Sequence, residues 1–211
     1  IFVINETHWI PKMIQDFGSA PVDRDLFIDV VLRTNHSTGG RTQEFDVDDF
    51  INKVDMPDNL SVRDFCDTLG HYFAASEGKS KYADKTPDYG PFIKSLSNVW
   101  PQCRFIHLIR DGRPVVRSML GHDGYRALLN SGAATWCDVA YDYRPDKGND
   151  IGEAEVGDMA ALWAERVRLT RAAGSQLPTD QYLEVRYEAL TQNPAAILSE
   201  ITAFCGLSMN D

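Results

Sequence analysis

A short apolar run that stops abruptly at charged residues constrains the fold of this chain more than any other feature. Residues 105–109 are apolar except for His107, and the run ends at Arg110-Asp111-Gly112-Arg113. A nearly continuous apolar run of this length is typical of a central strand that is covered on both faces. Pro114 suits the first turn of a helix, because its missing N–H would have no partner there. The segment therefore predicts a strand, a polar turn and a helix.

The predicted turn concentrates arginine in an acidic chain. Arg110, Arg113 and Arg117 lie in or just after it, whereas the 211 residues carry a formal net charge of -10. A strand–turn–helix corner at the carboxyl end of a parallel strand is where open α/β sheets bind ligands. Because the planar guanidinium suits phosphate oxygens, we expect the corner to hold an anion. The alternative is that Arg110 and Asp111 only cap and pair at the start of the helix.

This segment resembles the 3′-phosphate-binding segment of the sulfotransferases that use 3′-phosphoadenosine 5′-phosphosulfate. In that family the strand ends in Arg-Asp-Pro-Arg-Asp, and a serine follows eight positions after the first arginine. Arg110 and Ser118 stand at that spacing here. The resemblance implies that both residues bind the 3′-phosphate of the nucleotide. Gly112 and Pro114 replace the family's proline and aspartate, but neither position supplies a phosphate ligand.

Two further segments resemble the same family. The Lys-Thr-Pro step at Lys85 is similar to that of glycan, protein-tyrosine and bacterial sulfotransferases. It implies that Lys85 points into the active-site cleft and stabilises charge on the bridging oxygen as the bond breaks. The segment Tyr182–Leu190 resembles the strand that ends in Arg-Tyr-Glu-Asp-Leu, which implies that Tyr187 contacts the adenine. The alternatives are a solvated turn lysine and a plain core tyrosine.

The first residues of the sequence supply the candidate base. Asn5-Glu6-Thr7-His8-Trp9 resembles the Lys-Glu-x-His-aromatic segment of the glycan sulfotransferases, in which the glutamate is the proposed base. A positioned carboxylate can take the proton of an acceptor hydroxyl, so Glu6 ranks first. His8 is its rival, because the unperturbed pKa of histidine suits proton transfer near neutral pH. The alternative is that Glu6 is an exposed acid at the end of a strand.

The resemblance implies an α/β fold of the P-loop-NTPase-like, three-layer kind, with a central parallel sheet flanked by helices. A chain of 211 residues can build one substantial core, so we expect a single sulfotransferase domain over residues 1–211. Its family carries a 5′-phosphosulfate loop and a last nucleotide loop that we do not find in this sequence. The nearest candidate, Gly39-Gly40-Arg41-Thr42, follows no convincing strand and is rejected. We therefore expect both ends of the domain to be incomplete here.

The other segments predict helices and loops that support the site or contact the acceptor. Helical patterns run over residues 62–73 and 159–172, and we expect Trp163 in the core. Asn193-Pro194 begins a further helix that Gly206 closes. The acidic stretch 44–50 predicts a solvated start of a helix, and residues 130–157 predict a long loop. We expect the acceptor to be recognised there and around residues 34–41.

These observations predict a sulfotransferase that moves a sulfuryl group from 3′-phosphoadenosine 5′-phosphosulfate to an acceptor hydroxyl or amine. Adenosine 3′,5′-bisphosphate would be released, and the acceptor would be a small molecule, a glycan or another hydroxyl-bearing molecule. The alternatives are a P-loop kinase, whose Gly-x-x-x-x-Gly-Lys-Ser/Thr motif is not found in this sequence, and an inactive nucleotide-binding module.

Composition and charge limit the classes of partner and cofactor that we expect for this chain. The net negative charge argues against nucleic acid, and no apolar run reaches the roughly 18 residues of a membrane span. The histidines and the four cysteines have no metal-like spacing, so we expect no metal. Core thiols in a reducing compartment are favoured over disulfides, which favours the cytoplasm. The cysteines are Cys66, Cys103, Cys137 and Cys205.

Overall fold

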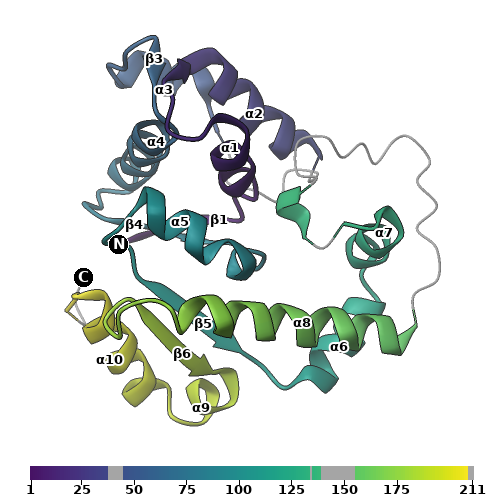
Figure 1. Cartoon of the computed structure of the whole chain (residues 1–211). Coiled ribbons are helices and arrows are strands. Elements are labelled where there is room, and N and C mark those ends of the chain that lie inside the picture. Colours follow the sequence, from purple (N-terminus) through teal and green to yellow (C-terminus); the bar gives the residue numbers. More distant parts are fainter. Residues whose placement is uncertain (38–44, 134, 139–154, 209–211) are drawn as a thin grey trace. The chain divides into compact units, whose positions relative to one another are not determined.

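Helices alternate with short strands through most of the chain (Figure 1). A computed structural model describes residues 1–37, 45–133, 135–138 and 155–208. Within the 211 residues, the chain divides into two compact units, which we describe one at a time. Unit 1 comprises Ile1–Tyr89 and Thr135–Asn149, and unit 2 comprises Gly90–Ala134 and Asp150–Asp211.

Unit 1 is organised by a parallel pair of strands. Strand β1 pairs with β4 from Phe2↔Tyr82 to Asn5↔Lys85, and the chain between them forms helices and a small antiparallel pair, β2 with β3. A parallel pair needs a long connection of this kind. The elements of unit 1 are β1 (Phe2–Asn5), α1 (Trp9–Phe17), β2 (Val22–Asp23), α2 (Arg24–Ser37), α3 (Val47–Lys53), β3 (Asn59–Leu60), α4 (Val62–Ser76), β4 (Tyr82–Lys85) and the 3-10 helix η2 (Trp136–Asp138).

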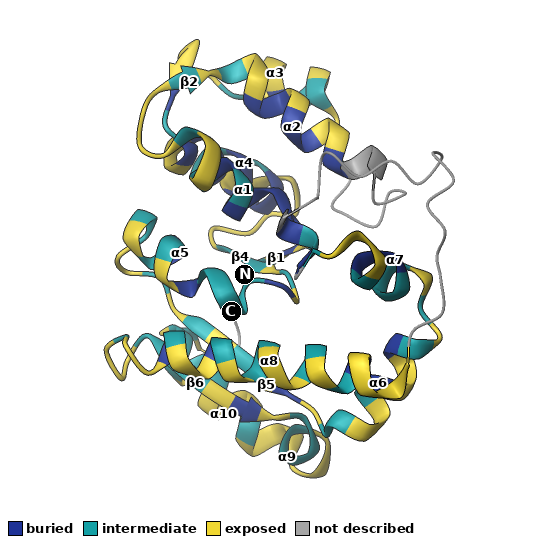
Figure 2. Cartoon of the chain, turned by 45° about the vertical axis from the view of Figure 1, so that its right-hand side comes forward, coloured by how far each residue is buried: buried dark blue, intermediate teal, exposed yellow. Residues whose placement is uncertain are grey.

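Aromatic side chains fill the core of unit 1. Phe65 of α4 lies at its centre, with ring centroids 5.0 Å from Phe27 of α2 and 6.4 Å from Phe50 of α3. All three side chains are fully buried, as is Met13 of α1. The buried residues of α1, α2 and α4 are dark blue in Figure 2. Burial of such large side chains stabilises a fold by about 1.5–3 kcal/mol each, so these helices hold the strand pair in place.

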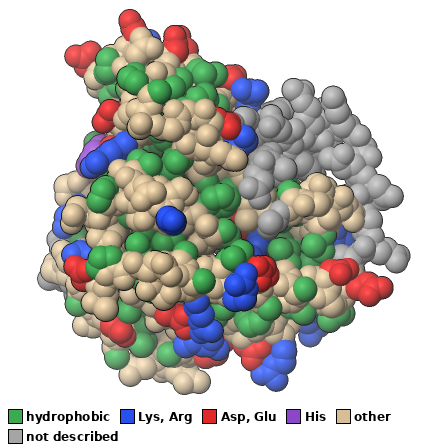
Figure 3. All heavy atoms as spheres, in the orientation of Figure 1, with side chains coloured by type: hydrophobic (Ala, Val, Ile, Leu, Met, Phe, Trp, Pro, Cys, Tyr) green, Lys and Arg blue, Asp and Glu red, His purple; other side chains and the backbone are tan. Residues whose placement is uncertain are grey.

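The acidic stretch starts a helix, as predicted. Asp46 caps α3, since its Oδ1 atom accepts a hydrogen bond from the Asp49 N–H at 3.0 Å. Further aspartates line α2 and the segment before β3, and Asp and Glu side chains are visible at the upper edge of Figure 3, where these elements lie. Exposed carboxylates of this kind are ordinary solvated surface.

Unit 2 is built around a second parallel pair. Strand β5 pairs with β6 from Phe105↔Tyr182 to Ile109↔Arg186. The predicted strand, turn and helix are confirmed, as is the helix that begins at Pro194 and ends before Gly206. The elements are the 3-10 helix η1 (Gly90–Phe92), α5 (Ile93–Val99), β5 (Phe105–Ile109), α6 (Gly112–Leu120), α7 (Asp123–Ser131), α8 (Val156–Gly174), β6 (Tyr182–Arg186), α9 (Tyr187–Gln192) and α10 (Pro194–Cys205).

One face of this pair packs against α8. The Tyr182 ring lies against Gly174 of α8, and its hydroxyl is 2.7 Å from Nδ1 of His107 on β5. On the opposite face of β5, Ile106 is 42% exposed and Leu108 is 50% exposed. The prediction that β5 is covered on both faces is therefore wrong for this second face. Alternation along a strand sends these two side chains away from α8.

Helices α6 and α8 share an apolar cluster. Val116, Met119 and Met159 are buried in it, and Trp163 packs against them, so the core position predicted for Trp163 is confirmed. A Cβ atom at Gly112 would lie 2.8 Å from the Trp163 ring. The glycine that stands where the family has proline therefore lets α8 approach the start of α6.

These elements form a mixed α/β fold with parallel strands flanked by helices, which confirms the predicted fold class. Cys66, Cys103, Cys137 and Cys205 are free thiols. Among the described residues, no helix is both long enough and apolar enough to cross a membrane.

The contact between Gly174 and Tyr182 predicts an unusual effect of alanine on stability. A Cβ atom at residue 174 would lie 2.3 Å from the tyrosine ring, so Gly174→Ala should lower the free energy of unfolding by about 1–3 kcal/mol through overpacking. Gly157→Ala on the same helix is the control, because no atom lies within 4 Å of its Cβ position. It should raise stability by up to about 1 kcal/mol through helix propensity. Urea unfolding measures both; equal effects would contradict the packing described here.

Candidate functional site

The parallel register of unit 1 brings Glu6 and Lys85 together. Lys85 is the last residue of β4, and its carbonyl accepts a hydrogen bond from the Glu6 N–H at 2.9 Å, one step beyond the end of β1. The Lys85 ammonium donates to Glu6 Oε1 at 2.7 Å. Because the two strands end side by side, the predicted base and the predicted cation form one ion pair.

His8 completes this group. Its Nε2 atom lies 3.6 Å from Glu6 Oε2, and the residue is buried at 6% exposure, whereas the Glu6 side chain is 28% exposed. Burial lowers the pKa of His8, and the nearby carboxylates of Asp88 and Glu6 offset this only in part. His8 is therefore neutral near pH 7. The structure brings Glu6, His8 and Lys85 together, whereas their assigned roles stay predictions.

Opposing effects set the protonation of Glu6. Partial burial would raise its pKa, but the hydrogen bond and charge of Lys85, with a smaller effect of His8, leave the pKa below its usual value. Glu6 is thus a carboxylate at neutral pH and can accept a proton. A carboxylate at this position can act as a general base, but its lowered pKa makes it a weaker proton acceptor than an unpaired glutamate.

The backbone that carries Glu6 and His8 is strained. Glu6 has φ 46° and His8 has φ 45°, in the left-handed region that residues other than glycine rarely adopt. Such conformations cost about 1–3 kcal/mol each and concentrate at active sites. Because His8 is also the residue that precedes α1, the strained turn connects the end of β1 directly to the helix.

A partly buried polar network lies behind this turn. The Thr7 N–H donates to the Thr86 hydroxyl oxygen at 3.0 Å, and the Thr86 hydroxyl donates to Asp84 Oδ1 at 2.7 Å. The hydroxyls of Thr7 and Tyr89 are also hydrogen bonded to each other. Burial raises the pKa of Asp84 to about 6, although the neighbouring hydroxyls favour its charged form. The sequence reasoning assigned no role to these residues, and the polar Asp84 within a short strand was the available signal.

Unit 2 forms a second corner at the ends of its own strands. Arg110 follows β5 and Tyr187 follows β6, one step beyond the paired residues Ile109 and Arg186. The Arg110 guanidinium carbon lies 4.9 Å from the centre of the Tyr187 ring, a cation–π contact. The strand β6 ends at Arg186, and Tyr187 is the first residue of α9. Arg110 and Tyr187, the two residues predicted to contact the nucleotide, therefore lie side by side.

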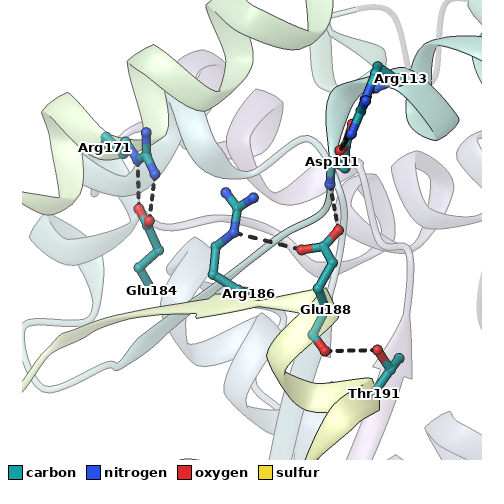
Figure 4. Close-up of polar contacts among 7 residues, drawn as sticks. All are labelled: Asp111, Arg113, Arg171, Glu184, Arg186, Glu188 and Thr191. Atoms are coloured by element: carbon teal, nitrogen blue, oxygen red, sulfur yellow. Dashed lines mark hydrogen bonds and ion pairs between the residues drawn. The ribbon is translucent and has the colours of Figure 1, made fainter.

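Carboxylates fix the backbone of this corner (Figure 4). Glu188 Oε1 accepts a hydrogen bond from the Asp111 N–H at 2.8 Å, which holds the residue after Arg110 against the start of α9. Asp111 caps α6 by accepting from the Arg113 N–H at 2.9 Å and also binds the Arg113 guanidinium. These bonds to Arg113 lower the pKa of Asp111 to about 2. The charge of Arg113 is therefore balanced by Asp111, whereas no described carboxylate pairs with Arg110.

The remaining groups of this corner fit an anion. Arg110, Arg117 and Ser118 are exposed. Within the described ranges, neither arginine forms an ion pair with a carboxylate, and the Ser118 hydroxyl makes no hydrogen bond. Cations without a local acidic partner and a free hydroxyl are the groups that a phosphate needs. Ser118 lies on α6, and the structure records no contact between its hydroxyl and Arg110.

The predicted acceptor segments are described only in part. Most of residues 34–41 and 130–157 lie outside the described residues, so acceptor recognition there stays a prediction. Thr34 is fully buried, and its hydroxyl donates to the Val30 carbonyl of its own helix at 2.9 Å. In the part of the chain that the structure describes, no three His, Cys, Asp or Glu side chains are grouped closely enough to hold a metal ion.

Comparisons with known proteins bear on the family and the fold of the chain. Residues 10–211 match the profile of a family described as the sulfotransferase family. The fold is similar to a solved structure described as the sulfotransferase domain from the curacin biosynthetic pathway, with a TM-score of 0.55 and 16% sequence identity. This similarity covers 98% of the present chain and 65% of the solved one. No curated protein matches the chain significantly.

The Glu6–Lys85 ion pair predicts how the carboxyl responds to loss of its partner. Lys85→Met removes the main group that lowers the pKa of Glu6 but leaves its burial in place, so the pKa should rise. Carboxyl-carbon NMR titration measures the shift. Lys12→Met is the control, because Lys12 forms its ion pair with Asp16 on α1. A Glu6 pKa that is unchanged in Lys85→Met would contradict the pairing.

Proposed function

Because this chain belongs to the sulfotransferase family, we propose that it transfers a sulfuryl group from 3′-phosphoadenosine 5′-phosphosulfate to the hydroxyl or amine of an acceptor. The observation that carries the proposal is the convergence of Glu6, His8 and Lys85 where two parallel strands end. Carboxyl ends of parallel strands are the usual location of ligands in α/β folds. The donor supplies an activated sulfuryl group whose leaving group is a stable nucleotide phosphate.

Residues of unit 2 would bind the nucleotide. Arg110 and Ser118 would bind its 3′-phosphate, since a guanidinium and a hydroxyl can both donate hydrogen bonds to phosphate oxygens. The Tyr187 ring supports the Arg110 guanidinium at 4.9 Å and would contact the adenine. Arg113 has no such role in this proposal, because Asp111 already binds it.

Residues of unit 1 would perform the proton transfer. Glu6 would take the proton of the acceptor hydroxyl as its oxygen attacks sulfur, and His8 would hold the carboxylate in place. Glu6 is preferred as the base because its side chain is 28% exposed and that of His8 only 8%, so an acceptor can reach the carboxylate. Lys85 would stabilise negative charge on the bridging oxygen of the breaking bond.

The position of Lys85 would also adjust the strength of the base. Lys85 now binds Glu6 and thereby lowers its pKa. If the ammonium turned toward the anionic donor, Glu6 would lose this stabilisation of its charged form, and its pKa would rise. A base with a higher pKa accepts a proton more readily. The same lysine could therefore assist the leaving group and prepare the base.

A screen of labelled sulfate transfer onto sugars, phenols, lipids and peptides tests the proposed reaction itself.

The nucleotide site predicts a selective loss of affinity. Arg110→Ala in the full-length protein should lower the affinity for adenosine 3′,5′-bisphosphate by tenfold or more, because a charge-assisted contact contributes about 1.5–3 kcal/mol to binding. The affinity for adenosine 5′-monophosphate should change little. Arg113→Ala removes the same charge from the same turn and is the matched control. Calorimetry measures the affinities of the unaltered protein and of both variants for the two nucleotides. Equal losses for both nucleotides would rule out a contact between Arg110 and the 3′-phosphate.

The identity of the base gives a second prediction. Glu6→Gln keeps the size of the side chain but cannot accept the proton, so turnover should fall by roughly 10²–10⁴-fold. The affinity for the bisphosphate should stay near that of the unaltered protein. His8→Ala should lower turnover much less, because it removes only a neighbour of the base. Steady-state kinetics decides: an active glutamine variant together with an inactive alanine variant would make His8 the base.

A further inference from the structure

We propose that Thr86 is a positioning residue for the Glu6–His8 turn: its hydroxyl, oriented by Asp84, holds the Thr7 N–H and so keeps Glu6 directed at Lys85. The proposal rests on the proposed function, since it concerns the same candidate base. Thr86 would touch neither the donor nor the acceptor. It would act through the backbone that carries Glu6.

The hydrogen-bond ladder shows why a side chain is needed at this point. The Glu6 N–H still binds a main-chain acceptor, the Lys85 carbonyl, at 2.9 Å. Glu6 then adopts φ 46°, and the chain leaves the ladder. The next N–H, that of Thr7, is bound at 3.0 Å by the Thr86 hydroxyl. Thr7 is 3% exposed, so without this acceptor its N–H would lack a partner away from water, which proteins avoid.

Asp84 gives the Thr86 hydroxyl a defined direction. A hydroxyl has one donor and can rotate. Because its hydrogen is directed to Asp84 Oδ1 at 2.7 Å, its lone pairs face the Thr7 N–H. Tyr89 adds a second restraint, since its hydroxyl is bonded to that of Thr7 and its N–H donates to the Thr86 carbonyl at 3.3 Å. Thr7 is therefore held through both its backbone and its side chain.

The strain on either side of Thr7 shows what this restraint accomplishes. Glu6 and His8 both have positive φ and flank the residue that Thr86 holds. Such a conformation persists only where the surroundings determine it. If the Thr7 N–H is released, both residues can relax to negative φ, which moves the Glu6 carboxylate from Lys85 and His8 from Glu6. A displacement of about 1 Å can cost a reaction roughly 100-fold in rate.

Burial of Asp84 supports a functional origin of the network. Its pKa of about 6 means that folding favours the protonated form, because burial disfavours the charge. The native protein binds this proton more tightly than the unfolded chain, so the group lowers stability as pH rises from its unfolded value of 3.8 through about 6. A residue that destabilises the fold at neutral pH and yet orients a turn beside a candidate base is better explained by function than by stability.

The test compares two substitutions at one residue. Thr86→Val keeps the shape of the side chain and removes the hydroxyl, whereas Thr86→Ser keeps the hydroxyl. Thr170→Val is the control for loss of a buried threonine hydroxyl elsewhere: Thr170 is 7% exposed, and its hydroxyl donates to the Arg166 carbonyl at 2.7 Å. If Thr86→Val does not fold, Thr86→Ala removes the same hydroxyl with a smaller side chain.

Two measurements on the full-length protein follow the variants. Amide hydrogen exchange at Thr7, measured by NMR, should accelerate roughly tenfold or more in Thr86→Val and stay slow in Thr86→Ser, because only the first loses the acceptor. In sulfate transfer, kcat should fall by roughly 10- to 100-fold in Thr86→Val, while bisphosphate affinity stays unchanged. Thr86→Ser should restore most of kcat, and Thr170→Val should resemble the unaltered protein.

The outcomes separate this proposal from the proposed function. A Thr7 amide that stays protected in Thr86→Val, or a kcat that stays unchanged, would overturn the role of Thr86. An equal loss of kcat in Thr170→Val would also overturn it, since any lost hydroxyl would then suffice. If the unaltered protein transfers no sulfate, the proposed function fails, but hydrogen exchange at Thr7 still decides whether Thr86 holds the turn.

Discussion

Parallel pairing of strands is the constraint on which both candidate corners depend. In each unit two strands run in the same direction and end together, at Asn5↔Lys85 in one and Ile109↔Arg186 in the other. The next residues along the chain are then neighbours, whatever lies between them in sequence. A shift of register by one residue would turn every side chain to the opposite face of its strand. The pairs of ionic and aromatic groups described above would then separate.

Both units extend this pairing beyond the strands in the same way. Where the main-chain ladder ends, a side chain accepts the next N–H: Thr86 binds Thr7 in unit 1, and Glu188 binds Asp111 in unit 2. In each case the bound residue adjoins a candidate ligand or base. The backbone of the turn is thereby fixed by hydrogen bonds and not by packing alone. Preorganised polar groups of this kind need no rearrangement at the moment of reaction.

Strong local patterns allowed several elements of the fold and several candidate site residues to be predicted from the sequence. The apolar run before Arg110 predicted β5 and its turn, because hydrophobic periodicity and turn chemistry are local signals. The family resemblance assigned Glu6 and Lys85 to the transfer reaction, and it assigned Arg110 and Tyr187 to binding of the nucleotide. Interactions that arise from register could not be predicted, because a threonine or a glutamate after a strand carries no distinctive pattern. The exposure of Leu108 was missed because a nearly continuous apolar run is typical of a strand covered on both faces, whereas Leu108 is 50% exposed here.

The partners in each corner are far apart along the chain. Glu6 and Lys85 are separated by 79 residues, and Asp111 and Glu188 by 77. Contacts of such length form late in folding, since the closure of long loops must precede them. During synthesis, the first corner cannot exist until Thr86 has emerged from the ribosome, and the second must wait for Glu188. A nascent chain that already contains β5 therefore carries Arg110 without the tyrosine ring that supports it.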